Sequence, residues 1–224
     1  MELTPEEIRV LGCLVEKEMT TPDNYPLSSN ALVSACNQTT SRDPIVHYTE
    51  REVDQVVLQL REGRLARTVR GDGQRVHKHK HIAGEALHLE RPSLALLSVL
   101  MLRGPQTVNE LRTRTERHGT GLDHAGVERA LEQMAGRDEP LVRLLPRRSG
   151  EREVRWIHLL GGAAMAEEQA AAPPSAMATP RAVAGGAGAA PSARADEVAE
   201  LRARLDELTR RFDVLLDRLG ETVE

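Results

Sequence analysis

Apolar residues recur at helical spacing near the start of the chain. They fall at positions i, i+3, i+6 and i+7 of one segment: Ile8, Leu11, Leu14 and Val15. The preceding Thr4-Pro5-Glu6-Glu7 sequence is typical of a helix start, because Thr4 and Glu7 can form a capping box and proline is tolerated in the first turn. The pattern predicts a helix that ends near Met19.

A second, shorter helix is predicted within residues 20–48. Pro22 and Pro26 mark a turn, and Ser28 or Ser29 can cap the helix that follows. The apolar stripe of this helix is Ala31, Leu32 and Ala35. A run of Thr, Ser and Asp residues closed by a proline then prevents the helix from continuing. The arrangement indicates the middle helix of a helix-turn-helix.

A third helix and a β-hairpin follow. Thr49-Glu50-Arg51-Glu52 is another capping box, and one buried face is indicated by Val53, Val56, Val57 and Leu60. Gly63 ends the helix. Residues 65–70 and 75–82 are predicted strands, joined by the glycine turn 71–74. Three helices and a hairpin predict a winged-helix domain over residues 1–84.

The same plan repeats over residues 85–160. Helices are predicted at 93–103, after Thr107 and at 123–136, and strands at 141–145 and 154–159. Val53 and Val127 stand as far apart in sequence as Leu60 and Met134, so the third helices share one register. The prediction is a mainly α fold with small β-hairpins (α+β), built from two tandem winged-helix domains.

The remaining residues differ in composition. Residues 161–193 are rich in Ala, Gly and Pro and predict a disordered linker, because they offer little apolar surface to bury. Residues 194–220 carry apolar positions that alternate by three and four, predicting a coiled-coil helix for oligomerisation: Val198, Leu201, Leu205, Leu208, Phe212, Leu215 and Leu219. Its partner stays open between an identical helix, a different acidic helix and the body of the protein.

A run of short motifs accompanies this pattern: Glu16-Lys17, Thr20-Thr21-Pro22-Asp23, Tyr25-Pro26-Leu27, Asn30-Ala31-Leu32, Ala35-Cys36-Asn37-Gln38 and Arg42-Asp43-Pro44. In these residues the chain resembles the YceH-type family of uncharacterised bacterial proteins, over about residues 2–160. The resemblance implies tandem winged helices, in agreement with the repeat, and brings no established activity. The linker and terminal helix look like an addition to the family pattern.

Composition and charge narrow the function. Aromatic residues make up only 2% of the chain, so the stacking surfaces of single-strand nucleic-acid binders are missing. The net charge is -4, and the whole acidic excess lies in residues 161–224. Because residues 1–160 carry no net charge, a strongly basic nucleic-acid-binding surface is not expected, and only a local basic patch is possible. Cys13 and Cys36 lie among apolar helical residues and are interpreted as buried thiols in a reducing compartment.

No targeting or membrane segment is expected. The N-terminus is charged and helical, unlike a signal peptide, and the longest apolar run, Leu94 to Leu102, is too short to span a bilayer. The sequence thus predicts a cytoplasmic protein without a membrane partner.

Candidate chemistry is sparse. His77, His79 and His81 alternate along a predicted strand and would share one face, as metal ligands can. The adjacent lysines disfavour a cation, so a solvated basic strand is the preferred interpretation. Gly71-Asp72-Gly73 lacks the helix that a phosphate-binding loop requires. We expect neither an enzyme nor a cofactor.

The more specific hypothesis is that the protein binds duplex DNA. In a winged helix the third helix enters the major groove and the hairpin contacts the DNA nearby. The candidate DNA-binding residues are Arg51, Gln55, Gln59, Arg70, Arg75, Lys78 and Lys80. Asp54 and Glu62 on the same helix would repel phosphate. The alternative is a protein-interaction scaffold that uses the winged helices and the terminal helix without DNA contact.

Overall fold

A computed structural model describes residues 2–70, 77–147 and 153–171, all of which belong to one compact unit, Met1–Ala178. The described part is mainly helical with two small antiparallel sheets, which confirms the α+β prediction. The predicted coiled-coil positions from Val198 to Leu219 lie outside the described residues, as do most of the predicted linker and Arg75.

The helices of the first half begin where the sequence predicts. They are α1 (Pro5–Thr20), α2 (Ser29–Cys36) and α3 (Glu50–Glu62), with a 3-10 turn η1 (Pro22–Asn24) between the first two. Thr4 and Thr49 each close a capping box, and the side chain of Ser28 caps α2. Each cap satisfies backbone N–H groups that the first helical turn leaves without a partner.

A three-stranded sheet completes this half. Its strands are β1 (Leu27–Ser28), β2 (Ala66–Val69) and β3 (Lys78–His81), in the order β1-β3-β2. The predicted hairpin strands are confirmed at shorter length, and β3 is the central strand because β1 pairs with its free edge. Both sides of β3 are therefore paired.

The second half follows the same order of helices and hairpin. It contains a short α4 (Ala83–Ala86), then α5 (Arg91–Arg103), α6 (Val108–Thr115), the 3-10 turn η2 (Glu116–His118) and α7 (His124–Ala135). The strands β4 (Val142–Leu144) and β5 (Trp156–His158) pair antiparallel. Thr107 forms the predicted capping box, and Asp123 caps α7.

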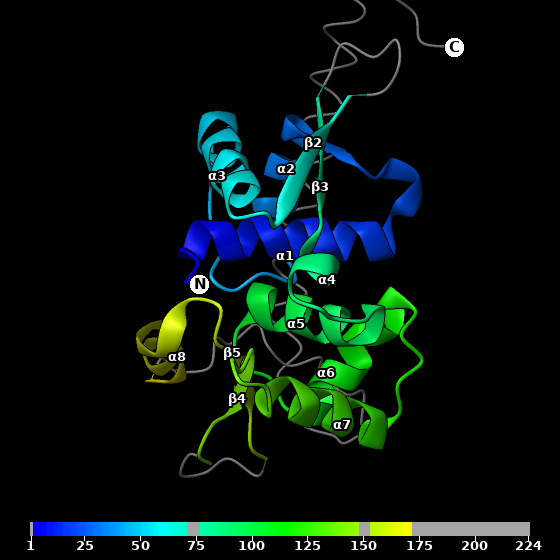
Figure 1. The fold of residues 1–224 in the computed structure, drawn as a ribbon, viewed down its shortest axis with the longest axis vertical. Coiled ribbons are helices and arrows are strands. Elements are labelled where there is room, and N and C mark those ends of the chain that lie inside the picture. The colour runs from blue at the N-terminus through cyan, green and yellow to red at the C-terminus, as the bar shows by residue number, and fades with distance from the viewer. Residues whose placement is uncertain (1, 71–76, 148–152, 172–224) are drawn as a thin grey trace, which may run out of the picture. The chain divides into compact units, whose positions relative to one another are not determined.

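The two halves meet where α1 packs on α5, which lie side by side in Figure 1. All nine residues from Leu94 to Leu102 are buried, so the longest apolar run is a core helix. Gly12 of α1 lies against this helix: a Cβ added there would stand 3.0 Å from two side-chain carbons of Leu102 and 3.2 Å from Cβ of Met101. One continuous core therefore spans both predicted domains.

One segment of the predicted linker is helical, so that prediction is wrong for residues 162–171. Helix α8 (Gly162–Ala171) buries Ala166 beside Leu145 and Ile157. Alanine has the highest helix propensity, and a small side chain suffices where a helix lies close to a hairpin. The absence of large apolar residues, on which the linker prediction rested, does not prevent this packing.

Two histidines are buried as neutral side chains. His158 on β5 and His118 in η2 are almost fully inaccessible, and their ring nitrogens have no hydrogen-bond partner among the described residues. Burial lowers the pKa of His158 to about 4. Burial and the nearby charge of Arg117 lower the pKa of His118 to about 4 as well.

These histidines predict destabilisation by acid. Below a pH of about 6.5 these histidines bind protons in the unfolded chain but stay neutral in the folded chain. The free energy of unfolding therefore decreases as the pH is lowered, and the loss is complete near pH 4. Each histidine contributes about 3 kcal/mol to that loss. Urea unfolding as a function of pH should show a weaker pH dependence for His158→Leu, whatever its stability at neutral pH. His47→Gln, at an exposed loop position, is the control that keeps the wild-type dependence.

The tight contact at Gly12 predicts intolerance of a larger residue. Gly12→Leu should lower the free energy of unfolding by about 1–3 kcal/mol, because the α1–α5 contact has no space for the side chain. Thr113→Leu, on the exposed face of α6, should change stability little. Urea denaturation followed by circular dichroism measures both, and equal stability of the two variants would contradict the packing described.

Candidate functional site

The candidate DNA-binding residues of α3 lie in one exposed stripe of that helix. Arg51, Gln55 and Gln59 are spaced by four residues, which places them on the same side of a helix, and all three are exposed. Leu58, which is 51% exposed, lies beside them. The opposite side of α3 is buried in the core through Val53, Val56, Val57 and Leu60.

Two acidic residues of α3 are engaged locally. Glu52 accepts hydrogen bonds from the backbone N–H and the hydroxyl of Thr49, each at 2.7 Å. Asp54 accepts a hydrogen bond of 2.6 Å from the hydroxyl of Ser29. The predicted repulsion of phosphate by Asp54 is therefore reduced by a hydrogen bond, although its negative charge remains.

The hairpin presents basic residues on its outer side. Arg67 pairs with Lys80 and Val69 pairs with Lys78, and directly paired residues lie on the same face of a sheet. These side chains are exposed or half-buried, and Arg70 is exposed at the end of β2. Strand β2 packs next to α3 (Figure 1), so the predicted residues of helix and hairpin are brought together.

The inner side of the hairpin corrects one prediction. His79 and His81 are buried, and only His77 is exposed, so β3 is not a solvated basic strand. Pairing on both edges turns alternate residues of β3 toward the body of the protein. His81 Nε2 lies 2.8 Å from Glu18 Oε2, and its backbone N–H donates to the Tyr25 hydroxyl. Within the described ranges no three His, Cys, Asp or Glu residues are grouped as metal ligands.

His79 belongs to a chain of hydrogen bonds that joins α3, α2 and the hairpin. Ser29 Oγ lies 3.1 Å from His79 Nε2, and Thr68 Oγ1 lies 3.2 Å from His79 Nδ1. Burial lowers the pKa of His79, which favours the neutral ring. Because Ser29 gives its proton to Asp54, the Nε2–H group of His79 must donate to Ser29. This order does not activate Ser29, since a nucleophilic serine must donate to its histidine.

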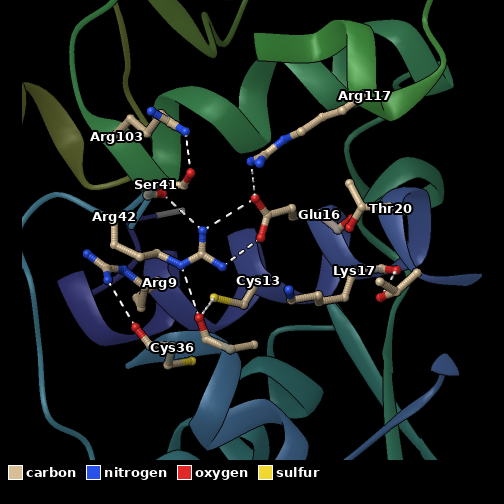
Figure 2. A network of polar contacts seen from close by, with 12 residues as sticks. Arg9, Cys13, Glu16, Lys17, Thr20, Cys36, Ser41, Arg42, Arg103 and Arg117 are labelled. Atoms are coloured by element: carbon tan, nitrogen blue, oxygen red, sulfur yellow. Dashed lines mark hydrogen bonds and ion pairs between the residues drawn. The ribbon is translucent and has the colours of Figure 1, made fainter. Parts of the chain in front are cut away.

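A second polar cluster is centred on one buried carboxylate (Figure 2). Glu16 of α1 lies 2.6 and 3.3 Å from two guanidinium nitrogens of Arg42, in the loop before α3. Its other partner is Arg117 of η2, at 2.6 Å. Burial acts to raise the pKa of Glu16, but its hydrogen bonds with Arg42 and the charges of both arginines lower it overall. One carboxylate thus joins α1, a loop and the second half of the unit.

Further groups fix this cluster. Arg42 also donates to the carbonyl oxygens of Ala35 and Ser41, and Arg103 donates to the Ser41 hydroxyl. Burial, with the nearby charges of Arg114 and Arg117, lowers the pKa of Arg103 to about 10. Sequence reasoning missed the cluster, although Glu16 and Arg42 stand in the motif that carried the resemblance. The available signal was the position of Glu16 directly after the apolar residues Leu14 and Val15.

The interpretation of the two cysteines is confirmed in part. Cys13 and Cys36 are both buried and free. A hydrogen bond with Cys13 and burial raise the pKa of the Cys36 thiol. The thiols lie beside the Glu16 cluster (Figure 2), and Cys13 Sγ is 3.4 Å from the carbonyl oxygen of Ala35.

A hollow of about 630 Å³ opens beside the cluster. It is lined by Glu16, Lys17, Thr20, residues 37–41 and Arg117. The lining is polar and contains no aromatic side chain, so it suits a polar ligand better than an apolar one.

Elsewhere, no helix in the described part of the chain has the length and apolar character needed to cross a membrane.

Comparison with known proteins matches the sequence of this chain to a family. Residues 3–151 match the family described as "Protein of unknown function, DUF480". A UPF0502 protein of Pelobacter propionicus is 51% identical over 162 residues, which cover 72% of this chain and 74% of the relative. UPF0502 proteins of Dechloromonas aromatica and Solibacter usitatus are 43% and 42% identical over 212 and 214 residues.

The longer alignments bear on the expectation that the linker and terminal helix are an addition to the family pattern. They cover 92% and 95% of this chain, and 91% and 98% of the relatives, so they extend beyond residue 171. The segment after the second half is therefore shared with these two relatives, although it lies outside residues 3–151, which match the family. The chain belongs to the DUF480, or UPF0502, family of uncharacterised bacterial proteins, which is the YceH-type family that its motif indicated.

Proposed function

We propose that this is a cytoplasmic tandem winged-helix protein that binds duplex DNA with modest affinity, in a regulatory role. The order α1-β1-α2-α3-β2-β3 of the first half supports a winged helix. The series α5, α6, α7 and the β4–β5 hairpin supports a second copy. In such a domain the third helix enters the major groove and the hairpin contacts the DNA beside it.

One observation carries the proposal: the exposed stripe of α3 is adjacent to the basic outer side of the hairpin. Glutamine can bind adenine and arginine can bind guanine through paired hydrogen bonds, so Arg51, Gln55 and Gln59 can read base edges. Lys78 and Lys80, with Arg67, can contact phosphates. Because few cations are involved and α3 also carries acidic residues, we expect modest affinity and a shallow salt dependence.

A protein-interaction scaffold is the second candidate. It is favoured by the exposure of two large apolar side chains, Leu58 on α3 at 51% and Ile45 in the preceding loop at 45%. Apolar residues on a recognition helix suit a protein partner at least as well as DNA. The terminal helix predicted at 194–220 would then add a second contact surface. Neither function requires catalysis, and we expect no enzymatic activity.

A salt titration of DNA binding tests the first candidate. Replacing Arg75, Lys78 and Lys80 together by Ala should flatten the slope of log K against log salt by about 2 to 3 units, because three phosphate contacts are lost. Arg112→Ala, on α6 in the second half, is the control that should keep the wild-type slope. Fluorescence anisotropy with labelled duplexes is the measurement. Failure to bind any duplex at ~50 mM salt would favour the scaffold.

The predicted terminal helix is tested separately. Truncation after residue 193 should lower the molar mass measured by light scattering, because the apolar positions of residues 194–220 are expected to pair between chains. The full-length double variant Leu205→Glu/Leu208→Glu should lower it equally, since both residues occupy the predicted seam. A mass that neither change alters would show that these residues do not drive assembly.

A further inference from the structure

The hollow beside Glu16 carries more positive than negative charge. Lys17 and Arg117 line it, and two further arginines bond to lining residues: Arg42 to Glu16 and Arg103 to the Ser41 hydroxyl (Figure 2). Glu16 is the one acidic residue in the lining, and its carboxylate is shared by Arg42 and Arg117. The single negative charge of Glu16 therefore has four positive charges near it, those of Lys17, Arg42, Arg103 and Arg117.

Other acidic residues near these cations are engaged elsewhere. Glu116 precedes Arg117 in η2 and lies 3.3 Å from Arg112. Glu18 follows Lys17 in α1 and contacts His81. Within the described ranges Lys17 forms no ion pair within 4.0 Å. Lys17 is half-buried, and the side chain of Arg117, which also pairs with Glu16, is 47% exposed, so both can contact an anion in the hollow.

Neutral donors line the same hollow. The side chains of Gln38, Thr39 and Thr40 form no hydrogen bond with another described residue, and all three are exposed or half-buried. The neighbouring Asn37 side chain is different, because it is already bonded to the backbone of Tyr48 through both its oxygen and its nitrogen. Amide and hydroxyl donors beside a lysine and an arginine form the set that binds phosphate oxygens in proteins.

The size and lining narrow the class of ligand. A volume of about 630 Å³ lies within the range of small-molecule sites. Since no aromatic side chain lines the hollow, a nucleobase would find no stacking surface. The recognised part of the ligand is therefore its charged groups.

We propose that this hollow binds the phosphate groups of a small phosphorylated metabolite. Lys17 and Arg117 neutralise the phosphate charge, and Gln38, Thr39 and Thr40 donate hydrogen bonds to its oxygens. Arg42 contributes by its bond to Glu16, which reduces the repulsion between that carboxylate and the ligand. This site is separate from the α3–hairpin surface and does not depend on DNA binding.

Isothermal titration of the full-length protein with inorganic pyrophosphate, and separately with ATP, tests the proposal. We expect saturable binding of one pyrophosphate per chain and comparable affinity for ATP, because the base contributes little. Lys17→Gln should weaken both by about tenfold, the effect of losing one charge-assisted hydrogen bond. Lys80→Gln, which removes one lysine from the outer side of the hairpin, is the matched control and should leave both affinities unchanged.

A second variant guards against a folding defect. Gln38→Ala/Thr39→Ala changes only side chains that bond to no described residue, so it should weaken pyrophosphate binding while leaving the melting temperature unchanged. The absence of saturable binding at millimolar pyrophosphate would overturn the proposal, as would an equal loss in Lys80→Gln. A Lys17→Gln variant weakened only toward duplex DNA would also overturn it, since the hollow would then contact nucleic-acid phosphate.

Discussion

The buried carboxylate of Glu16 is the interaction on which the arrangement of the described unit most depends. It is only 4% exposed, a position where an unpaired charge is costly. Arg42 and Arg117 compensate that charge from two different parts of the chain. Because Glu16 bonds to both arginines, this carboxylate fixes the loop before α3 and the turn after α6 relative to α1.

The same helix organises the apolar contacts. Gly12 and Glu16 are one turn apart on α1, so the close approach to α5 and the polar cluster lie on the same side of the helix. In Figure 1, α3 and the β2–β3 hairpin lie on one side of α1 and the second half lies on the other. The surface proposed for DNA therefore lies on the same continuous core as the second half.

Local features of the chain were predictable, whereas long-range ones were not. The caps at Thr4, Thr49 and Thr107 depend on residues three positions apart, and all three were found from sequence. The burial of His79 depends on its pairing with β1, which is far away in sequence. The charged neighbours Lys78 and Lys80 instead favoured a solvated strand. The Glu16 cluster likewise joins residues up to 101 positions apart. Helix α8 was missed because composition was weighed above alanine's helix propensity.

The packing of α1 on α5 also has a consequence for biosynthesis. A ribosome completes α1, α2, α3 and the first hairpin before any residue of α5 exists. The side of α1 around Gly12 is therefore not covered by α5 in the early nascent chain. Exposed apolar surface of this kind invites premature association with other chains. Gly12 can be covered by Leu102 only after that residue has been translated.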